Sequence, residues 1–336
     1  MATLKDVARL ANCDVSTVSR ALNNTSYVHP DTKARILEAV KELNYHPNVI
    51  TRSLHQGKRR TIGVIVPKIQ LSVFGDVILG IQQEARKNGY ATLISSCGED
   101  EKLEKDELNR LREGFVDGLI IAGTGKNTRL LRDIHAGGIA MTQIVRFSDN
   151  SISSVDVDYE LIGYQATQYM ISKGCRQIGL INGPDYISPY KGRLLGYKRA
   201  MKENDLDILT VELPSVNRGT GYGHDCAEKL LDMNSMLDGI LTATDGQGLG
   251  ALRALKENGI RVPEQMKVIS MTGHEIGKML ETTLTSMELP AIEIGETAVR
   301  ITLEEITCMN DANLRKTRYK PKHVTLEATL EKRESC

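Results

Sequence analysis

Residues 3–22 restrict the possible folds more than any other part of the chain, because they have the pattern of two short helices joined by a polar turn. Thr3 is a favourable N-cap for the first helix, and Asp6 three positions later gives a weak form of the capping box. In the second helix Val18 and Leu22 lie one turn apart, so we expect both to face inward.

The outward side of the second helix carries small hydroxyls and one arginine, with no acidic residue among them. A helix N-terminus of this composition suits a groove lined by phosphates and base edges. The alternative is a small helical domain with an ordinary polar face. The outward residues are Ser16, Thr17, Ser19 and Arg20.

A third helix is predicted to begin at Pro30, where the missing N–H costs no hydrogen bond. Its apolar stripe consists of Ile36, Val40 and Leu43, and the helix ends at residues 44–47. Three short helices around one small core are typical of a DNA-binding headpiece of the helix-turn-helix type.

The charge distribution agrees with this interpretation. Residues 1–60 contain ten Lys and Arg against five Asp and Glu, whereas the whole chain has 43 of each. The remaining body therefore has 33 basic and 38 acidic side chains. Binding to a phosphate backbone by counterion release requires such an excess of positive charge in the first segment.

The remaining composition excludes several classes of protein. With 336 residues the chain can form two or three domains. It opens on a capped helix and has no apolar run of roughly 18 residues, so we expect neither a secretory signal nor a membrane span. No metal-ligand spacing of Cys or His occurs, so we expect reduced thiols in the cytoplasm, no disulfides, no metal and no cofactor. The cysteines are Cys13, Cys97, Cys175, Cys226, Cys308 and Cys336.

Residues 48–60 form a basic connector with one large apolar residue, Leu54, close to Arg52. Linkers are usually rich in Gly, Ser or Pro, so this composition needs a reason. One interpretation is a solvated connector whose Leu54 docks on the body. The other is an element of the DNA minor groove, in which Leu54 is a wedge between base steps and the basic residues hold the backbone.

From Thr61 onward, apolar strands alternate with helices, and the cycle restarts in the second half. This alternation predicts an α/β fold with doubly wound parallel sheets in two lobes. Ligands of such sheets bind outside the carboxyl ends of the strands, so we expect a site in the cleft between the lobes. The predicted strands are 61–67, 90–95, 118–122, 155–157, 177–181, 239–243 and 267–271, and the predicted helices are 74–88, 102–112, 128–135, 160–173, 191–204 and 249–258.

In order and spacing, the motifs of the chain resemble those of the LacI/GalR (lactose-repressor) family of bacterial transcription regulators. The resemblance runs nearly from end to end, and it depends on many motifs together. The matching residues are Lys5-Asp6-Val7-Ala8, Val15-Ser16-Thr17-Val18-Ser19-Arg20, Tyr45-x-Pro47-Asn48, Arg52-Ser53-Leu54, Thr61-Ile62-Gly63, Val116-Asp117-Gly118-Leu119-Ile120, Ser154-Val155-Asp156-Val157-Asp158, Arg193-Leu194-x-Gly196-Tyr197, Leu249-Gly250-Ala251-Leu252-Arg253-Ala254-Leu255 and Leu284-Thr285.

The resemblance implies an N-terminal three-helix helix-turn-helix headpiece and a periplasmic-binding-protein-like core of two doubly wound parallel-sheet subdomains. The implied divisions are a headpiece at 1–46, a hinge helix and linker at 47–60, and an effector-binding and dimerisation core at 61–336. Within the core, the N-subdomain would comprise about 61–160 and 291–320, and the C-subdomain about 161–290 and 321–336.

By the same resemblance, the chain would bind a pseudo-palindromic operator in double-stranded DNA as a homodimer. Val15, Ser16 and Arg20 would read bases, and Leu54 would be the wedge in the minor groove. The C-terminus has no leucine-heptad tail, so we expect no tetramer. The implied DNA-contacting set is Thr3, Val15, Ser16, Thr17, Ser19, Arg20, Asn23, Asn48, Arg52 and Leu54.

The cleft residues depart from the family pattern in one direction. The pocket aspartate of the family is Val145 here, although Arg146 stays, and the Asp-Asp pair becomes Thr272-Gly273. Fewer carboxylates make the cleft more positive, so we hypothesise an anionic effector such as a phosphorylated sugar, with Arg193 and Arg218 as clamps. The implied effector-binding residues are Phe74, Thr124, Arg146, Arg193, Arg218, Asp245 and Thr272.

Two alternatives remain open for the core. In one, the effector is a neutral sugar held by Asp245 and backbone groups, with Arg218 exposed to solvent. In the other, the core responds to a partner protein, as in regulators of the catabolite-control type. An enzyme is not expected, because the chain lacks P-loop, H-E-x-x-H and G-x-S-x-G spacing. The predicted function is a sequence-specific DNA-binding regulator, a repressor of carbohydrate uptake or catabolism genes.

Overall fold

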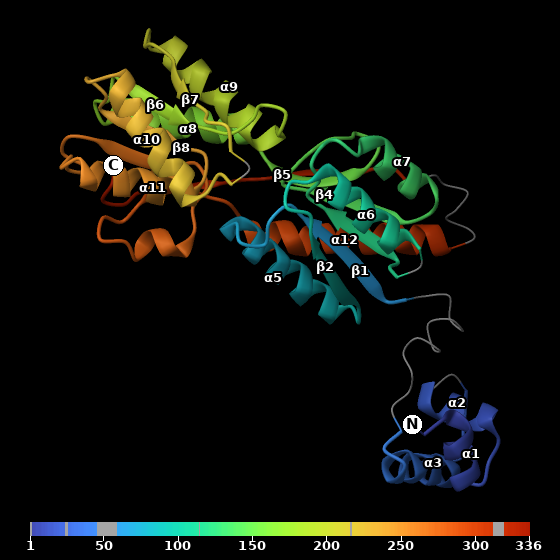
Figure 1. Cartoon of the computed structure of the whole chain (residues 1–336). Coiled ribbons are helices and arrows are strands. Elements are labelled where there is room, and N and C mark those ends of the chain that lie inside the picture. Colours follow the sequence, from blue (N-terminus) through green and yellow to red (C-terminus); the bar gives the residue numbers. More distant parts are fainter. Residues whose placement is uncertain (1, 24–25, 46–58, 114, 216, 312–318) are drawn as a thin grey trace. The chain divides into compact units, whose positions relative to one another are not determined.

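The computed structural model describes residues 2–23, 26–45, 59–113, 115–215, 217–311 and 319–336. The chain divides into two compact units, one up to Arg59 and the other from Arg60 onward. Figure 1 labels the helices and strands of both units.

Over its described residues, the first unit contains the helices α1 (Leu4–Leu10), α2 (Val15–Asn23) and α3 (Pro30–Glu42). Thr3 caps α1: the Thr3 N–H donates to the Asp6 carboxylate at 2.9 Å, and the Asp6 N–H donates to the Thr3 hydroxyl at 3.4 Å. The predicted capping box is therefore confirmed.

The three helices of the first unit enclose one small apolar core. The predicted inward residues Val18 and Ile36 are fully buried, and Leu22 is partly buried against them. The other buried members are Val7, Ala8, Ala11, Ala21 and Ala39. Because the apolar side of α2 packs in this core, the opposite side of the helix faces solvent.

The second unit begins with a lobe whose sheet has six parallel strands in the order β11-β5-β4-β3-β1-β2. Helices α5 and α12 pack together on one face, and α6 and α7 bury a separate apolar cluster on the other. The elements are β1 (Thr61–Val66), α5 (Ser72–Lys87), β2 (Ala91–Ser96), α6 (Glu101–Arg112), β3 (Gly118–Ile121), α7 (Thr128–Ala136), β4 (Ala140–Ile144), β5 (Ser153–Val157), α12 (Ala291–Asn310) and β11 (His323–Leu326).

The second lobe repeats this plan in the strand order β12-β10-β9-β8-β6-β7, with β12 antiparallel to β10 and the other pairs parallel. Helices α8 and α9 pack together on one face, and α10 and α11 on the other. The elements are α8 (Tyr159–Ser172), β6 (Ile178–Ile181), α9 (Ser188–Glu203), β7 (Leu209–Val211), α10 (Thr220–Met233), β8 (Gly239–Thr242), α11 (Asp245–Glu257), β9 (Lys267–Ser270), a 3-10 helix (Glu275–Lys278), β10 (Thr285–Glu288) and β12 (Thr329–Glu331).

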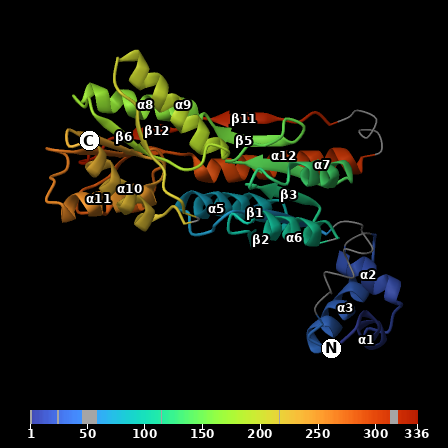
Figure 2. The same ribbon diagram turned by 45° about the horizontal axis from the view of Figure 1, so that its top comes forward.

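The chain crosses between the lobes three times: between β5 and α8, between β10 and α12, and between β11 and β12. The predicted boundary at the last crossing is wrong. Residues 321–336 are predicted in the C-subdomain, but β11 pairs with β5 in the first sheet, with Val324 opposite Val155 (Figure 2). A four-residue edge strand has too little apolar pattern to assign it to either sheet, and the crossing follows Leu326.

Among the described residues, no helix combines the length and the apolar character that spanning a bilayer requires.

The contact between α8 and α9 depends on a missing side chain at Gly196, where a Cβ would lie 2.0 Å from the Glu160 carbonyl oxygen. We expect Gly196→Ala to push the helices apart and to lower the free energy of unfolding by about 1–3 kcal/mol or more. Gly221→Ala in α10 is the control, because a Cβ there has no atom within 4 Å. Urea denaturation of both variants measures the difference, and equal losses would contradict the assigned packing.

Candidate functional site

Helix α2 has one apolar side in the core and one polar side open to solvent. Val15, Ser16 and Arg20 are exposed, and Thr17 and Ser19 are half-buried beside them. The first turn contains no acidic residue, although Asp14 directly precedes it and accepts the Thr17 and Val18 N–H groups with its carbonyl. The positive end of a helix dipole attracts anions such as phosphate. These are the side chains that the sequence assigns to DNA.

The structure does not describe the side chains of four predicted DNA-contacting residues. Asn48, Arg52 and Leu54 lie outside the described residues, as does the side chain of Asn23. The wedge at Leu54 therefore stays a prediction. Thr3 is placed, and its hydroxyl donates to the Asp6 carboxylate at 2.7 Å.

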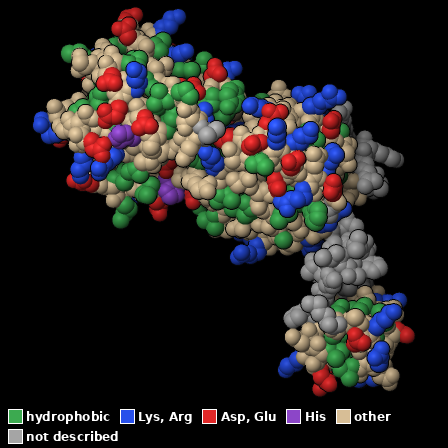
Figure 3. All heavy atoms as spheres, in the orientation of Figure 1, with side chains coloured by type: hydrophobic (Ala, Val, Ile, Leu, Met, Phe, Trp, Pro, Cys, Tyr) green, Lys and Arg blue, Asp and Glu red, His purple; other side chains and the backbone are tan. Residues whose placement is uncertain are grey.

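The visible face of the second unit carries basic and acidic side chains in an interspersed arrangement (Figure 3). This agrees with the small acidic excess of residues 61–336. That face therefore offers no continuous basic surface for a phosphate backbone.

A cavity of about 50 Å³ lies between the two lobes of the second unit, and residues of both lobes line it. Its wall is mainly apolar and includes Leu71, Val73, Ile187 and Leu289. The Phe147 N–H of the first lobe donates to the Ser188 hydroxyl of the second at 3.0 Å, so the lobes are in contact beside this small space and the cleft is closed there. Five of the seven predicted effector residues line it, namely Phe74, Arg146, Arg193, Asp245 and Thr272.

Arg193 is the most deeply buried cation of this cleft, with 4% of its surface exposed. One of its terminal nitrogens donates to the Thr272 hydroxyl at 2.5 Å, and its guanidinium lies 4.6 Å from the ring centroid of Tyr159. Its Nε has no hydrogen-bond partner, and no carboxylate of the described residues forms an ion pair with it. A buried cation in this state has unused capacity for an anion or for hydroxyl oxygens.

Asp156 is the acidic residue whose charge acts on Arg193 from a greater distance. Burial raises the pKa of the Asp156 carboxyl to about 7. Near neutral pH the carboxyl is therefore partly protonated, and it compensates the charge of Arg193 only in part.

Arg146 has a full partner, in contrast to Arg193. Its two terminal nitrogens donate to the two carboxylate oxygens of Glu99, each at 2.7 Å. Burial disfavours the Glu99 carboxylate, but the bonds to Arg146 outweigh this and hold its pKa below the ordinary value. Glu99 also has a φ of 67°, in the left-handed region, so the loop accepts backbone strain to place this carboxylate. The cleft is consequently less positive than the replacement at Val145 predicts.

The other two predicted effector residues lie outside the enclosed cavity. The Thr124 N–H and hydroxyl donate to the Glu104 carboxylate at 2.6 and 2.9 Å, and Asn127 donates to it at 2.8 Å. Thr124 therefore belongs to a buried network that fixes the loop after β3. Arg218 is half-buried before α10, where its charge helps to lower the pKa of Glu99. Its Nε is buried without a hydrogen-bond partner, and its clamp role stays a prediction.

The sequence reasoning missed four residues of the site: Ser72, Glu99, Tyr159 and Tyr190. Tyr190 lies one helical turn before Arg193 in α9, and this spacing could have indicated that both face the same side. Ser72 and Tyr159 begin the helices α5 and α8, which follow strands whose carboxyl ends meet the cleft. Glu99 has no comparable signal.

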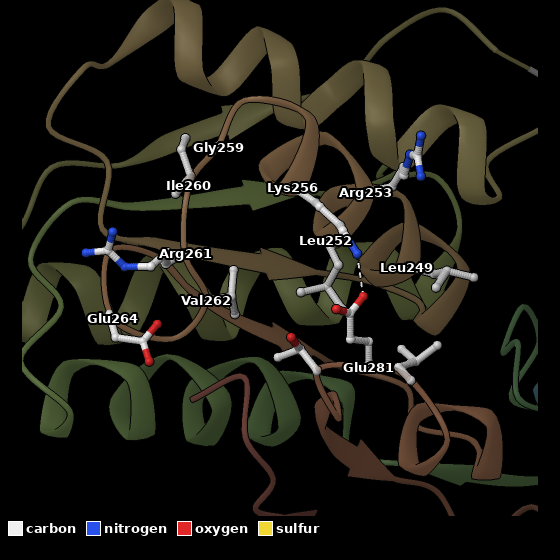
Figure 4. A pocket seen from close by; sticks show the side chains of 12 residues that line it. Leu249, Leu252, Arg253, Lys256, Gly259, Ile260, Arg261, Val262, Glu264 and Glu281 are labelled. Atoms are coloured by element: carbon white, nitrogen blue, oxygen red, sulfur yellow. Dashed lines mark hydrogen bonds and ion pairs between the residues drawn. The ribbon is translucent and has the colours of Figure 1, made fainter.

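A larger hollow of about 640 Å³ lies on the second lobe, between α11 and the loops 259–264 and 280–282 (Figure 4). Lys256 and Glu281 form an ion pair there, and both side chains are mostly exposed. A polar ligand needs buried polar groups that converge on it, and this hollow has exposed, mutually paired charges instead. The enclosed cleft therefore remains the candidate effector site.

No three His, Cys, Asp or Glu side chains in the described part of the chain are grouped so that they could hold a metal ion.

Two family models match the chain. The model of bacterial regulatory proteins of the lacI family matches residues 3–48, and that of the periplasmic binding protein-like domain matches residues 167–336. The chain belongs to the LacI family of bacterial regulatory proteins. It is a DNA-binding transcription regulator whose core has the fold of an effector-binding domain.

Relatives of this LacI-family chain are similar over nearly its whole length. The ribose operon repressor of Halalkalibacterium halodurans is 29% identical and the match covers 91% of each chain. The transcriptional repressor PurR of Haemophilus influenzae is 30% identical, over 91% of this chain and 92% of its own. A crystal structure of the Lac repressor dimer bound to operator and the anti-inducer ONPF has a TM-score of 0.87 at 23% identity, over 99% and 98% of the two chains, which shows the same fold.

The Arg146–Glu99 pair yields a test of the cleft's electrostatics. Glu99→Gln leaves a buried guanidinium without its charge partner, so we expect a loss of about 3–5 kcal/mol in the free energy of unfolding at pH 7. The folded pKa of Glu99 lies below its ordinary 4.5, so the stabilisation is complete above pH 4.5 and is lost as the pH falls through the folded value. The difference between wild type and variant should therefore shrink in acid.

Denaturant titrations at pH 7 and in acid measure this difference. Glu281→Gln is the control, because it breaks only the exposed pair with Lys256, which solvent screens, and should therefore cost much less than Glu99→Gln. A loss at Glu99 no larger than at Glu281 would show that the buried pair does not stabilise the cleft.

Proposed function

We propose that this protein is a cytoplasmic transcriptional repressor without enzymatic activity, which controls carbohydrate uptake or catabolism genes. It binds a pseudo-palindromic operator in double-stranded DNA as a homodimer, and a small molecule in the cleft sets its DNA affinity. The observation that carries the effector part is the buried Arg193, which lies in an interlobe cavity without a carboxylate partner. The two relatives are named as repressors, and the Lac repressor structure is a dimer on its operator.

The proposed effector is a hydroxylated molecule with one anionic group, such as a phosphorylated sugar. Arg193 supplies the cation for the anionic group, because Arg146 is already neutralised by Glu99. Asp245, which also lines the cavity, supplies an acceptor for a hydroxyl. Phe74 and Leu289 supply apolar surface for the carbon skeleton. This division of groups is typical of small-molecule sites, in which a few polar groups fix orientation within apolar walls.

Calorimetry with matched pairs tests the effector class: D-ribose against ribose 5-phosphate, and D-glucose against glucose 6-phosphate. A phosphate held by Arg193 should bind at least about tenfold more tightly than the neutral partner, since charge-assisted bonds are the stronger ones. Arg193→Gln should abolish this preference, whereas Arg199→Gln on the same helix should keep it, because Arg199 is exposed and outside the cavity.

Equal binding of both members of a pair would support a neutral sugar instead. Binding of none of the four compounds, with no shift in melting temperature, would favour the core that responds to a partner protein.

The DNA side is tested at Arg20, which is exposed on α2. Arg20→Ala should relax the sequence preference at one half-site position by about 1–3 kcal/mol, because an arginine that reads a base discriminates between bases. Selection of bound sequences from a random DNA pool, for wild type and variant, measures the preference. Arg9→Ala on α1 is the control, since Arg9 is equally exposed but lies outside the predicted contact set. Identical selected sequences for wild type and Arg20→Ala would show that Arg20 does not read a base.

A further inference from the structure

The carboxylate of Asp245 already has a hydroxyl bound to it. The Ser72 Oγ donates to the Asp245 Oδ2 at 2.7 Å. Ser72 is the first residue of α5 in the first lobe, and Asp245 is the first residue of α11 in the second lobe. The bond therefore joins the two lobes across the cavity that both residues line.

Two more polar contacts cross the same cleft. The Phe147 N–H donates to the Ser188 hydroxyl at 3.0 Å, and the His274 Nε2 lies 3.8 Å from a carboxylate oxygen of Asp76. Asp76 follows Ser72 by one helical turn in α5, so the start of this helix meets two separate segments of the second lobe. The Ser72 bond is the shortest of the three contacts and the one that uses a proposed effector residue.

We propose that Ser72 is an internal competitor for the Asp245 carboxylate, and that the bond between them keeps the lobes closed while no effector is bound. The proposal rests on the assignment of Asp245 to the effector site made above. It adds Ser72 as a residue that determines which chemical group an effector must carry.

The competition follows from the chemistry of the two donors. A serine hydroxyl and a sugar hydroxyl form the same kind of bond to a carboxylate, so one can replace the other without leaving the charge unsatisfied. A ligand without a suitably placed hydroxyl would displace Ser72 and leave one oxygen of the half-buried Asp245 carboxylate without its donor, which is unfavourable; the other oxygen keeps the Gly246 N–H. The site therefore selects for hydroxylated ligands before any other contact is made.

The position of the bond adds a second consequence. A ligand that enters between the lobes has to part the contacts that join them, so we expect the lobes to separate when it binds. Separation of the lobes breaks the Ser72–Asp245 bond. A stronger bond therefore lowers the apparent affinity of every effector. Removing the bond lowers the cost of opening, and the ligand-free protein alone can show this.

Hydrogen–deuterium exchange of the full-length protein, without any ligand, tests the proposal. In Ser72→Ala, backbone amides in residues 71–77, 244–250 and 272–277 should exchange about tenfold faster than in wild type, because a bond to a charged group is lost from the closed state. Ser72→Thr keeps the hydroxyl and should retain the exchange rates of the wild type.

The matched control is Ser95→Ala. The Ser95 hydroxyl donates to the Glu107 carboxylate at 2.6 Å within the first lobe, so this variant loses the same kind of bond without touching the cleft. Its exchange in the three cleft segments should stay at the wild-type rate. Unchanged exchange in Ser72→Ala, or an equal increase in Ser95→Ala, would overturn the proposal.

A double-mutant cycle shows whether Ser72 acts through Asp245. In an Asp245→Asn background, Ser72→Ala should accelerate exchange less than half as much as in wild type, because the charged acceptor is already gone. Additive effects would mean that the two residues stabilise the closed state independently, which overturns the competitor role. No effector is present, so this result does not depend on which ligand the calorimetry identifies, or on whether it identifies one.

Discussion

The cleft between the lobes depends on how buried charges are compensated. Three charged groups line it, and each is compensated differently: Arg146 has a bidentate carboxylate, the half-buried Asp245 has a serine hydroxyl, and Arg193 has a hydroxyl and an aromatic ring but no carboxylate. An uncompensated buried charge is costly, so it is retained only where the surroundings or a ligand offset that cost. Of the two guanidiniums that line the cavity, Arg193 is the one without a carboxylate partner in the described part of the chain, and this distinguishes the cleft from an ordinary packed interface.

Strands and helices with strong periodicity could be predicted from the sequence, and elements whose burial contradicts their polarity could not. β4 is fully buried although it contains a glutamine, because the Gln143 amide donates to the carbonyls of Asp149 and Ile152. Glu305 in α12 is buried in a similar way: it is 1% exposed, and its carboxylate accepts the Met141 N–H at 2.8 Å. In both elements long-range hydrogen bonds allow polar residues inside, and no local pattern reveals such bonds.

The same distinction applies to the candidate site. Arg193 and Asp245 could be found because each has a local signal: Arg193 stands in the motif Arg193-Leu194-x-Gly196-Tyr197, and Asp245 begins the helix that follows a buried strand. Glu99 and Ser72 could not, because their roles depend on partners 47 and 173 residues away and, for Ser72, on closure of the two lobes. Motifs of a family predict which groups reach the cleft, whereas the groups that compensate them follow from the packing of this particular chain.

Arg193 is also placed to pass a binding event to the rest of the molecule. Its aromatic partner, Tyr159, lies where the chain first crosses between the lobes, so a shift of the guanidinium toward an anion changes a contact of the crossing segment itself. The chain enters the first lobe directly after the basic segment. The Arg60 N–H donates to the Asp117 carboxylate at 2.6 Å, and β1 begins at the next residue, Thr61. A ligand can shift the equilibrium between the closed and the open core only by its difference in affinity for these two states. In the closed state Asp245 has the Ser72 hydroxyl and Arg193 has no carboxylate among the described residues, so an anionic, hydroxylated ligand would replace the first interaction and add an ion pair at Arg193, and that ion pair would be the source of the difference.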